Sequence, residues 1–225
     1  MHRKQLATGV RMSAMLIAVG LSMVGCGGSD TAPISKVTSS HAATPDLATP
    51  LNFAQIKQVV ELQSMPIGWK PGAQPLSGRD VPKDAPCRKP SGVCAGETST
   101  VVVQYNNADN TGNVYLEVHA YEDREAARAG YQSRSASSND KSDRQISMPT
   151  VGNASVARTG VNVATGDPFT AIVMRVGTVA ALVVYTHEGK VDPPMLLSLA
   201  RLEAERIQQV QRGGKPTATL SNQEG

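Results

Sequence analysis

One short segment, residues 114–121, carries the side chains whose types and spacing could do chemistry. Tyr115, Glu117, His119 and Tyr121 stand at every second position, with apolar residues between them. A period of two is typical of a half-buried antiparallel strand, so the four polar side chains are expected on one face as a candidate ligand-binding set. An imidazole and a carboxylate placed in this way could share a proton or hold a metal ion. The alternative interpretation is the solvated outer face of a sheet.

Two further residues with reactive side chains are Cys87 and Cys94, which have six residues between them. In a chain exported to an oxidising compartment, such a pair favours a disulfide. Closing this small loop would lower the entropy of the unfolded chain and so stabilise the fold by roughly 2.5 kcal/mol in the chain-entropy model. A metal site is the alternative, but the pair has neither a Cys-x-x-Cys spacing nor a second Cys/His pair beside it.

The third cysteine, Cys26, follows a segment with the pattern of a secretory signal. Residues 3–11 hold three basic side chains, residues 12–22 are mostly apolar, and Gly25 directly precedes the cysteine. This order of a basic, an apolar and a small-residue region predicts a signal peptide over residues 1–25. It resembles a bacterial lipoprotein signal, in which the cysteine becomes the new N-terminus and carries a thioether-linked lipid.

The alternatives to a lipoprotein signal are an ordinary secretory signal with an incidental cysteine and a transmembrane helix. The apolar run is shorter than the ~20 residues that a bilayer requires, which disfavours the helix. A lipid on Cys26 would place the protein at the outer surface of the cytoplasmic membrane. A single acyl chain binds membranes only marginally, so stable attachment requires two or more, such as added palmitate.

The charge balance of the chain excludes one class of partner. Its 225 residues have a formal net charge of +3, but beyond residue 25 there are 19 basic and 19 acidic side chains. A nucleic-acid partner would need a basic face, so none is expected. Electrostatic binding to a membrane is disfavoured for the same reason, which leaves the lipid as the expected means of attachment.

Composition divides the chain into four parts. Residues 1–25 are the expected lipoprotein signal peptide, and residues 26–50 are small, polar and interrupted by proline, which predicts a disordered tether. Residues 51–212 carry the periodic apolar patterns of a folded domain. Residues 213–225, which begin with two glycines, are expected to form a disordered tail.

The folded part is predicted to be α+β, with an antiparallel sheet of about five strands and helices packed on one face. Helices are expected after the capping residues Asn52, Asp123 and Asp192. Trp69 is expected to plug the edge of the core. The most apolar run beyond the signal, Thr178–Thr186, is expected to be central and covered on both faces. The remaining strands are expected at residues 100–105, 114–121, 151–157 and 169–175.

Several of these features together resemble a known family. A single tryptophan follows the first expected helix, residues 151–157 read VGNASVA, residues 169–187 read FTAIVMRVGTVAALVVYTH, and a helix closes the domain. Residues 51–212 are thus similar to the extracellular sensor-like domains of actinobacterial envelope proteins. The best-known members are the outer domains of membrane serine/threonine kinases, and stand-alone lipoproteins carry related folds. The resemblance implies a ligand-binding cleft between sheet and helices and two disulfides, whereas this chain has cysteines for one.

The motif search favours a protein that binds without catalysing. No Gly-x-Ser-x-Gly, His-Glu-x-x-His or phosphate-binding loop occurs, so neither an enzyme nor a cofactor is expected. We expect a membrane-anchored ligand-binding or sensing module whose partner is a small molecule or an envelope protein, with the ligand held by apolar packing. Trp69 joins the strand face at 115–121 as a candidate binding residue. The alternatives are a protein that docks on an envelope component through a sheet edge or the Trp69 loop, and a hydrolase with an unrecognised site.

Overall fold

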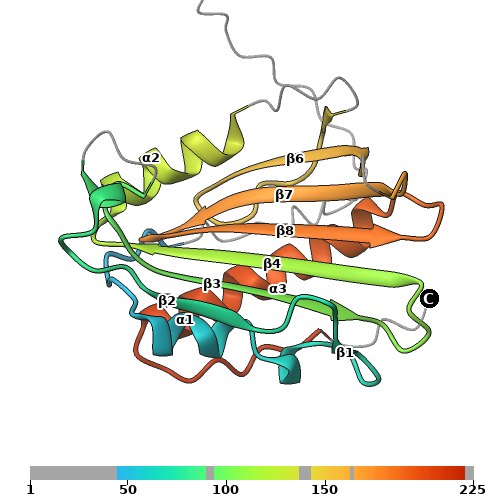
Figure 1. Ribbon diagram of the computed structural model, residues 1–225, viewed down its shortest axis with the longest axis horizontal. Helices are drawn as coiled ribbons and strands as arrows, with labels where there is room; N and C mark the ends of the chain where they lie inside the picture. The colour runs from blue at the N-terminus through green and yellow to red at the C-terminus, as the bar shows by residue number, and fades with distance from the viewer. Residues whose placement is uncertain (1–44, 90–93, 137–142, 163–164, 221–225) are drawn as a thin grey trace, which may run out of the picture. The chain divides into compact units, whose positions relative to one another are not determined.

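The computed structural model describes residues 45–89, 94–136, 143–162 and 165–220, so Cys26 and the expected signal peptide lie outside the described residues. Along this part of the chain, a first helix is followed by four strands, a second helix by four more strands, and a third helix comes last (Figure 1). The helices are α1 (Phe53–Val59), α2 (Arg124–Ser135) and α3 (Pro193–Gln211), with short 3-10 turns at Leu62–Ser64 and Pro86–Arg88. The strands are β1 (Lys70–Pro71), β2 (Ser77–Asp80), β3 (Glu97–Asn106), β4 (Gly112–Tyr121), β5 (Arg144–Ile146), β6 (Ala154–Val161), β7 (Pro168–Val176) and β8 (Val179–His187).

The described strands form one antiparallel sheet with the order β1-β3-β4-β8-β7-β6-β5, and β2 also pairs with β3. The sheet therefore has eight strands, where the sequence predicts about five. The strands that the prediction missed are β1, β2 and β5, which are two, four and three residues long. They are too short to show an alternating pattern, and they lie at the edges of the sheet, where short strands are common.

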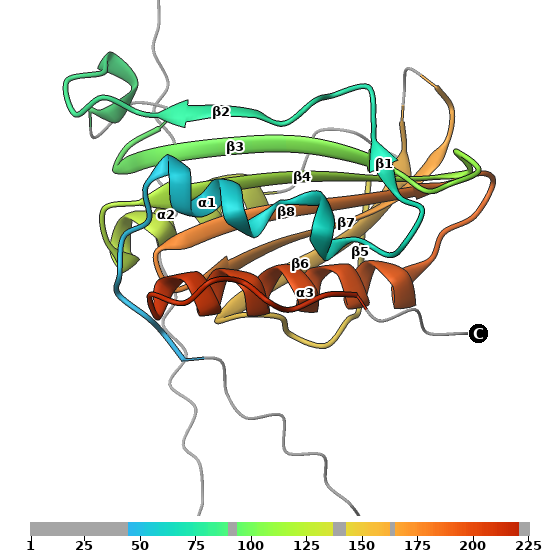
Figure 2. The same cartoon turned by 90° about the horizontal axis from the view of Figure 1, so that it is seen from below.

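The helices cover both faces of the sheet, so the prediction of helices on one face is wrong. α1 and α3 pack on one face and enclose the main apolar core. α2 packs on the opposite face, against β4, β7 and β8. Figure 2 shows α1 and α3 on the near side of the sheet, with α2 behind it. The apolar stripe of α2 is narrow and consists mainly of Ala126, Ala127 and Tyr131, which gives no indication of the face it covers.

Each helix begins at the capping residue that the sequence indicates. Asn52 accepts a hydrogen bond from the backbone N–H of Gln55, whose side chain in turn accepts from the backbone of Asn52. Asp123 and Asp192 accept from the third residue of α2 and α3 in the same way. These bonds satisfy N–H groups that have no partner within the helix, so all three predicted helix starts are confirmed.

The alternation on β4 is confirmed and defines the two faces of the sheet. Val114, Leu116, Val118 and Ala120 are buried in the core beneath α1 and α3. On the neighbouring β8, Val183 and Ala181 lie opposite Leu116 and Val118 and continue this buried face. The other side of β4 carries the polar side chains, and it is the face on which α2 packs. β8 is central as predicted and covered on both faces at its start, but Leu182 and Val184 are only half-buried.

Part of the expected tail after residue 212 contacts the folded domain. The side-chain oxygen of Gln209 accepts a hydrogen bond from the backbone N–H of Thr217 at 2.8 Å. The backbone N–H of Leu220 donates to the carbonyl of Ser64 at 3.0 Å, and the Leu220 side chain packs against the core. Among the described residues, no helix is long and apolar enough to cross a membrane.

Candidate functional site

The polar face of β4 carries a group of ionisable side chains beneath α2, which we call the His119 cluster: His119, Glu117, Glu97 and Arg134. Nε2 of His119 lies 2.6 Å from Oε1 of Glu117, and its Nδ1 lies 3.1 Å from Oε2 of Glu97. A guanidinium nitrogen of Arg134, on α2, lies 2.9 Å from the same Nδ1 and 3.3 Å from Glu97. Both ring nitrogens of His119 therefore have protein partners, and its side chain is buried.

Glu97 reaches this cluster because β3 has a bulge at its start. The register shifts between Glu97 and Ser99, so that Glu97 lies opposite Tyr121 while Ser99 lies opposite Ala120. The hydroxyls of Thr98 and Ser99 both donate to the carbonyl of Leu51, on the α1 side of the sheet. One extra residue in the strand thus turns Glu97 to the opposite face, which is the effect expected of a β-bulge.

The electrostatics of the cluster favour an ion pair between His119 and its carboxylates. Burial opposes a charge on the imidazole, but the hydrogen bonds to Glu117 and Glu97 outweigh it and raise the pKa of His119. The nearby charge of Arg134 acts in the opposite direction. The hydrogen bond from His119 is also the main reason that the pKa of Glu117 is lowered, against the effect of its own burial.

The two tyrosines of the strand face have different surroundings. Tyr121 is buried against α2, where a Cβ atom added to Gly130 would lie 2.2 Å from its hydroxyl oxygen. Tyr115 is half-buried and donates its hydroxyl to Oε2 of Glu117 at 3.2 Å. Burial and the charge of Glu117 raise the pKa of Tyr115 to about 12, so this hydroxyl stays protonated at neutral pH. Tyr115 is the residue at which the cluster ends and an open part of the face begins.

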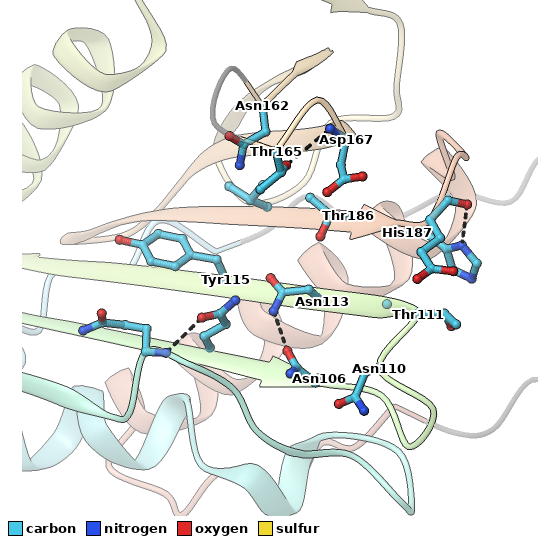
Figure 3. Close-up of a pocket in the computed structure, with 15 residues that line it drawn as sticks. Asn106, Asn110, Thr111, Asn113, Tyr115, Asn162, Thr165, Asp167, Thr186 and His187 are labelled. Carbon is cyan, nitrogen blue, oxygen red and sulfur yellow. Dashed lines mark hydrogen bonds between the residues drawn. The ribbon is translucent and has the colours of Figure 1, made fainter.

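Beyond Tyr115, the same face is hollowed into a pocket of about 680 Å³, which we call the amide pocket (Figure 3). Its floor is formed by polar-face residues of β3, β4 and β8, and its walls by the turns that end these strands and by the β6–β7 turn. Most of the lining side chains are amides and hydroxyls. The lining residues are Gln74, Gln104, Asn106, Asn110, Thr111, Gly112, Asn113, Tyr115, Asn162, Thr165, Asp167, Val184, Thr186, His187 and Glu188.

Hydrogen bonds within the protein hold the amides of the pocket floor in place. Nδ2 of Asn113 donates to Oδ1 of Asn106 at 2.6 Å across the β3–β4 pair. Oε1 of Gln104 accepts from the backbone N–H of Gln74 at 2.9 Å. Thr186 lies opposite Asn113 on β8, so Asn106, Asn113 and Thr186 form a row across three strands, as Figure 3 shows. This pocket is polar and lies opposite α1 and α3, so it differs from the expected apolar ligand site.

The sequence-predicted candidates are divided among these places. Tyr115 lines the amide pocket, whereas Glu117, His119 and Tyr121 lie beneath α2. Trp69 is half-buried and packs against the main core. The predicted disulfide between Cys87 and Cys94 is present, with Cα atoms 5.0 Å apart. The structure thus separates Trp69 from the strand residues and brings Tyr115 into a different group from its neighbours.

Sequence reasoning missed Glu97 and Arg134 of the His119 cluster and most of the amides that line the amide pocket. Glu97 lies before the expected strand at residues 100–105, and simple alternation along β3 would place it on the core face. Arg134 is one of several polar residues on α2, and no pattern singles it out. The amides Gln104, Asn106 and Asn113 have a weak signal, since they alternate with apolar residues at the ends of two predicted strands.

The arrangement gives little support to a metal centre. Among the residues that the structure describes, no group of three or more His, Cys, Asp or Glu side chains is arranged to hold a metal ion. Within the His119 cluster, each imidazole nitrogen already faces a carboxylate or a guanidinium. The interpretation of the whole strand face as a solvated surface is wrong, because His119 and Tyr121 are buried.

Comparisons with known proteins include a distant structural likeness. No protein-family model matches the chain, and no curated protein matches it. The structure is similar to the crystal structure of the extracellular domain of PknH from Mycobacterium tuberculosis, with 16% sequence identity and a TM-score of 0.41. The match covers 71% of this chain and 93% of that one. At this TM-score, nothing about function is carried over from that protein to this chain.

Proposed function

We infer that this chain is an exported, lipid-anchored protein whose folded part, residues 51–212, binds a ligand without catalysing a reaction. The amide pocket is the observation that carries this proposal. Its volume of about 680 Å³ falls within the range of known ligand pockets, roughly 300–1,000 Å³. The disulfide supports an oxidising compartment, and the sequence before Cys26 supports a lipid anchor at the outer surface of the cytoplasmic membrane.

The surroundings of the ionisable groups favour binding over catalysis. A general base must reach its substrate directly or through one water molecule. His119 is enclosed by Glu117, Glu97 and Arg134, and α2 covers it. The amide pocket is lined mainly by neutral amides and hydroxyls, whose chemistry is hydrogen bonding to a bound molecule, and its ionisable lining residues are Asp167, His187 and Glu188. We therefore favour binding over the hydrolase alternative.

The ligand proposal can be tested with the full chain exported from a host that processes lipoproteins. Native mass spectrometry of the detergent-extracted protein should show a bound small molecule, or extracts of the cell envelope should raise its melting temperature. Val184→Trp, which would fill the amide pocket from its floor, should abolish both effects. Val191→Trp, at a partly exposed position outside the lining, is the control. Retention of the ligand by Val184→Trp, or no ligand at all, would contradict the proposal.

The lipid anchor has a separate test. Cys26→Ser should release the protein into the medium or leave residues 1–25 uncleaved, because only the cysteine can accept a thioether-linked lipid. Mass spectrometry of the N-terminal peptide should find acyl chains on Cys26 in the natural protein. An unmodified Cys26 in a protein free of the membrane would disprove the anchor, with no consequence for the pocket.

A second candidate function is docking on another protein of the envelope, and Ile67 favours it. Its side chain is 94% exposed in the loop that leads to Trp69, although single exposed apolar residues are common on protein surfaces. If this loop docks on a partner, Ile67→Ser should weaken an amine crosslink formed from the exposed Lys70 in intact cells and leave ligand binding unchanged. An equally strong crosslink in both proteins would count against this candidate.

A further inference from the structure

We propose that the amide pocket recognises a neutral, polyhydroxylated ligand of the class of short oligosaccharides. This inference rests on the proposed binding function and names the chemical class of its ligand. It is argued from three properties of the pocket: the hydrogen-bonding groups that its floor leaves open, the distribution of charge around it, and its limited apolar surface.

The floor presents donors and acceptors that are fixed in position and not used within the described part of the protein. The bond between Asn113 Nδ2 and Asn106 Oδ1 leaves the other end of each amide open, namely the Asn113 carbonyl as an acceptor and the Asn106 amino group as a donor. Gln104 is tied in the same way through its carbonyl, which leaves its amino group open. Each amide is thus held by one end and directs the other at a ligand.

Such a set matches the chemistry of neighbouring hydroxyl groups. A hydroxyl both donates and accepts, so the several hydroxyls of a sugar can bind to acceptors and donors placed along one row. Asn113 offers an acceptor and Asn106 a donor at the outer ends of their bonded pair, and Thr186, opposite Asn113, adds a hydroxyl to the row. A ligand with one polar group would leave most of this row without a partner, which costs free energy once the row is covered.

The charges and the apolar residues that line the amide pocket restrict the class of ligand further. No Lys or Arg lines the pocket among the described residues, whereas Asp167 and Glu188 lie on its surrounding turns. An anionic ligand would therefore meet like charge and no compensating cation. The apolar lining is mainly Tyr115 and Val184, which suits the small C–H faces of a sugar ring better than a lipid or an aromatic molecule.

Saturation-transfer NMR on the full chain would test the proposal with three probe sets: neutral gluco-, manno-, galacto- and arabino-oligosaccharides of two to four units, spermidine, and oligogalacturonate. We expect transfer to at least one neutral oligosaccharide and none to oligogalacturonate. Asn113→Ala and Thr186→Val should each weaken that binding at least tenfold without changing the melting temperature greatly. Gln132→Ala, which removes an exposed amide on α2, should bind like the natural protein.

Each contrary outcome separates this inference from the function on which it rests. Binding of spermidine alone, lost in Thr186→Val, would overturn the sugar class, and binding of oligogalacturonate alone would overturn the neutral character of the ligand; either result would leave a ligand-binding pocket. Oligosaccharide binding that both variants retain would overturn the pocket as its site. If no probe binds while native mass spectrometry still finds a ligand that Val184→Trp loses, the sugar class is wrong and the proposed function stands. Failure of both experiments would overturn both.

Discussion

Nε2 of His119 lies 2.6 Å from Oε1 of Glu117, although the two residues are separated by only one position on β4. Both side chains point to the same face, and Glu97 and Arg134 approach the imidazole from β3 and α2. Tyr115 and Tyr121 stand on either side along the strand. A partly buried pair of this kind links the stability of the fold to pH, because each partner titrates differently in the folded and unfolded chain.

The sign of this linkage follows from the two pKa shifts. The pKa of His119 is raised above 6.5, so its contribution to stability is fully present below about pH 6.5 and is lost as the pH rises through the folded-state pKa. The pKa of Glu117 is lowered below 4.5, so its contribution is present above about pH 4.5 and is lost as the pH falls through its folded-state value. The pair should stabilise most between these limits.

We therefore predict that His119→Gln destabilises the protein more at pH 5.5 than at pH 8.5. Urea unfolding of the variant and the natural protein at both pH values would measure the two differences in the free energy of unfolding. Gln132→Ala, at an exposed position on α2 that does not titrate, is the control and should show no such difference. An equal loss of stability at both pH values would show that His119 is not charged in the fold.

A second prediction concerns Arg134. Its guanidinium nitrogen lies 2.9 Å from Nδ1 of His119, and its positive charge lowers the pKa of the imidazole. Arg134→Met should remove this positive charge from beside Nδ1, where the protonated imidazole donates to Glu97, and raise the pKa of His119 further. NMR titration of the imidazole carbon-bound protons would measure the change. Arg128→Met, an exposed position on α2, should leave the titration unchanged. A fall in the His119 pKa would contradict this account.

A third prediction concerns the contact between α2 and the sheet at Gly130. Alanine normally stabilises a helix by about 1 kcal/mol relative to glycine. Here an added Cβ atom would lie 2.2 Å from the hydroxyl oxygen of Tyr121, which is buried. Overpacking of this kind costs roughly 1–3 kcal/mol, so Gly130→Ala should lower the free energy of unfolding.

The control for Gly130→Ala is the same change in a Tyr121→Ala background. There the obstruction is gone, and the substitution should be neutral or stabilising. A double-mutant cycle measured by urea unfolding gives the coupling between the two positions directly. If Gly130→Ala stabilises the natural protein, then α2 does not pack on Tyr121 as closely as the structure indicates.

The features that sequence predicted correctly depend on local chemistry. The caps Asn52, Asp123 and Asp192 act on N–H groups within three residues, and the alternation on β4 indicates directly which side chains face the main core. The disulfide joins two cysteines that are close in the chain. In each case the residues that interact are near one another in sequence, so their types and spacing contain most of the information.

The features that sequence did not predict depend on how distant segments meet. The stripe of α2 is made mainly of small residues, and only packing on Tyr121 and Ala180 determines that it covers the polar face. The bulge that brings Glu97 to His119 shifts the β3–β4 pairing by one residue. The sequences of β3 and β4 show no pattern that predicts this shift. The row of side chains in the amide pocket forms only when β3, β4 and β8 pair in the correct register.

The disulfide provides a fourth prediction. The carbonyl of Cys94 accepts a hydrogen bond from the backbone N–H of Glu97 at 3.0 Å, so the bridged loop leads directly into the bulge. Cys87→Ser with Cys94→Ser should lower the free energy of unfolding by roughly 2.5 kcal/mol. Hydrogen exchange should increase first at residues 94–99, while the amides of β8 remain protected. Loss of protection across the whole sheet at once would show that the loop is part of the cooperative core.

The last prediction concerns a buried carboxyl group on α3. Glu203 is 2% exposed, and Oε1 has no hydrogen-bond partner among the described residues. Arg206, one turn further along, directs its guanidinium at carbonyls instead, with Nε donating to Val59 and another nitrogen to Ala218. Burial therefore raises the pKa of Glu203 to about 8, although the charge of Arg206 acts to lower it.

A carboxyl group with a raised pKa in the fold favours the folded state most at low pH. Its contribution is fully present below about pH 4.5 and is lost as the pH rises through about 8. Glu203→Gln has nearly the same shape and does not titrate, so relative to the natural protein it should gain roughly 3–5 kcal/mol between pH 4.5 and pH 8.5. Urea unfolding across this range measures the gain. Glu205→Gln, which is exposed on the same helix, should follow the natural protein at every pH. A difference between Glu203→Gln and the natural protein that does not change with pH would mean that Glu203 is ionised in the fold and has a partner that neutralises it.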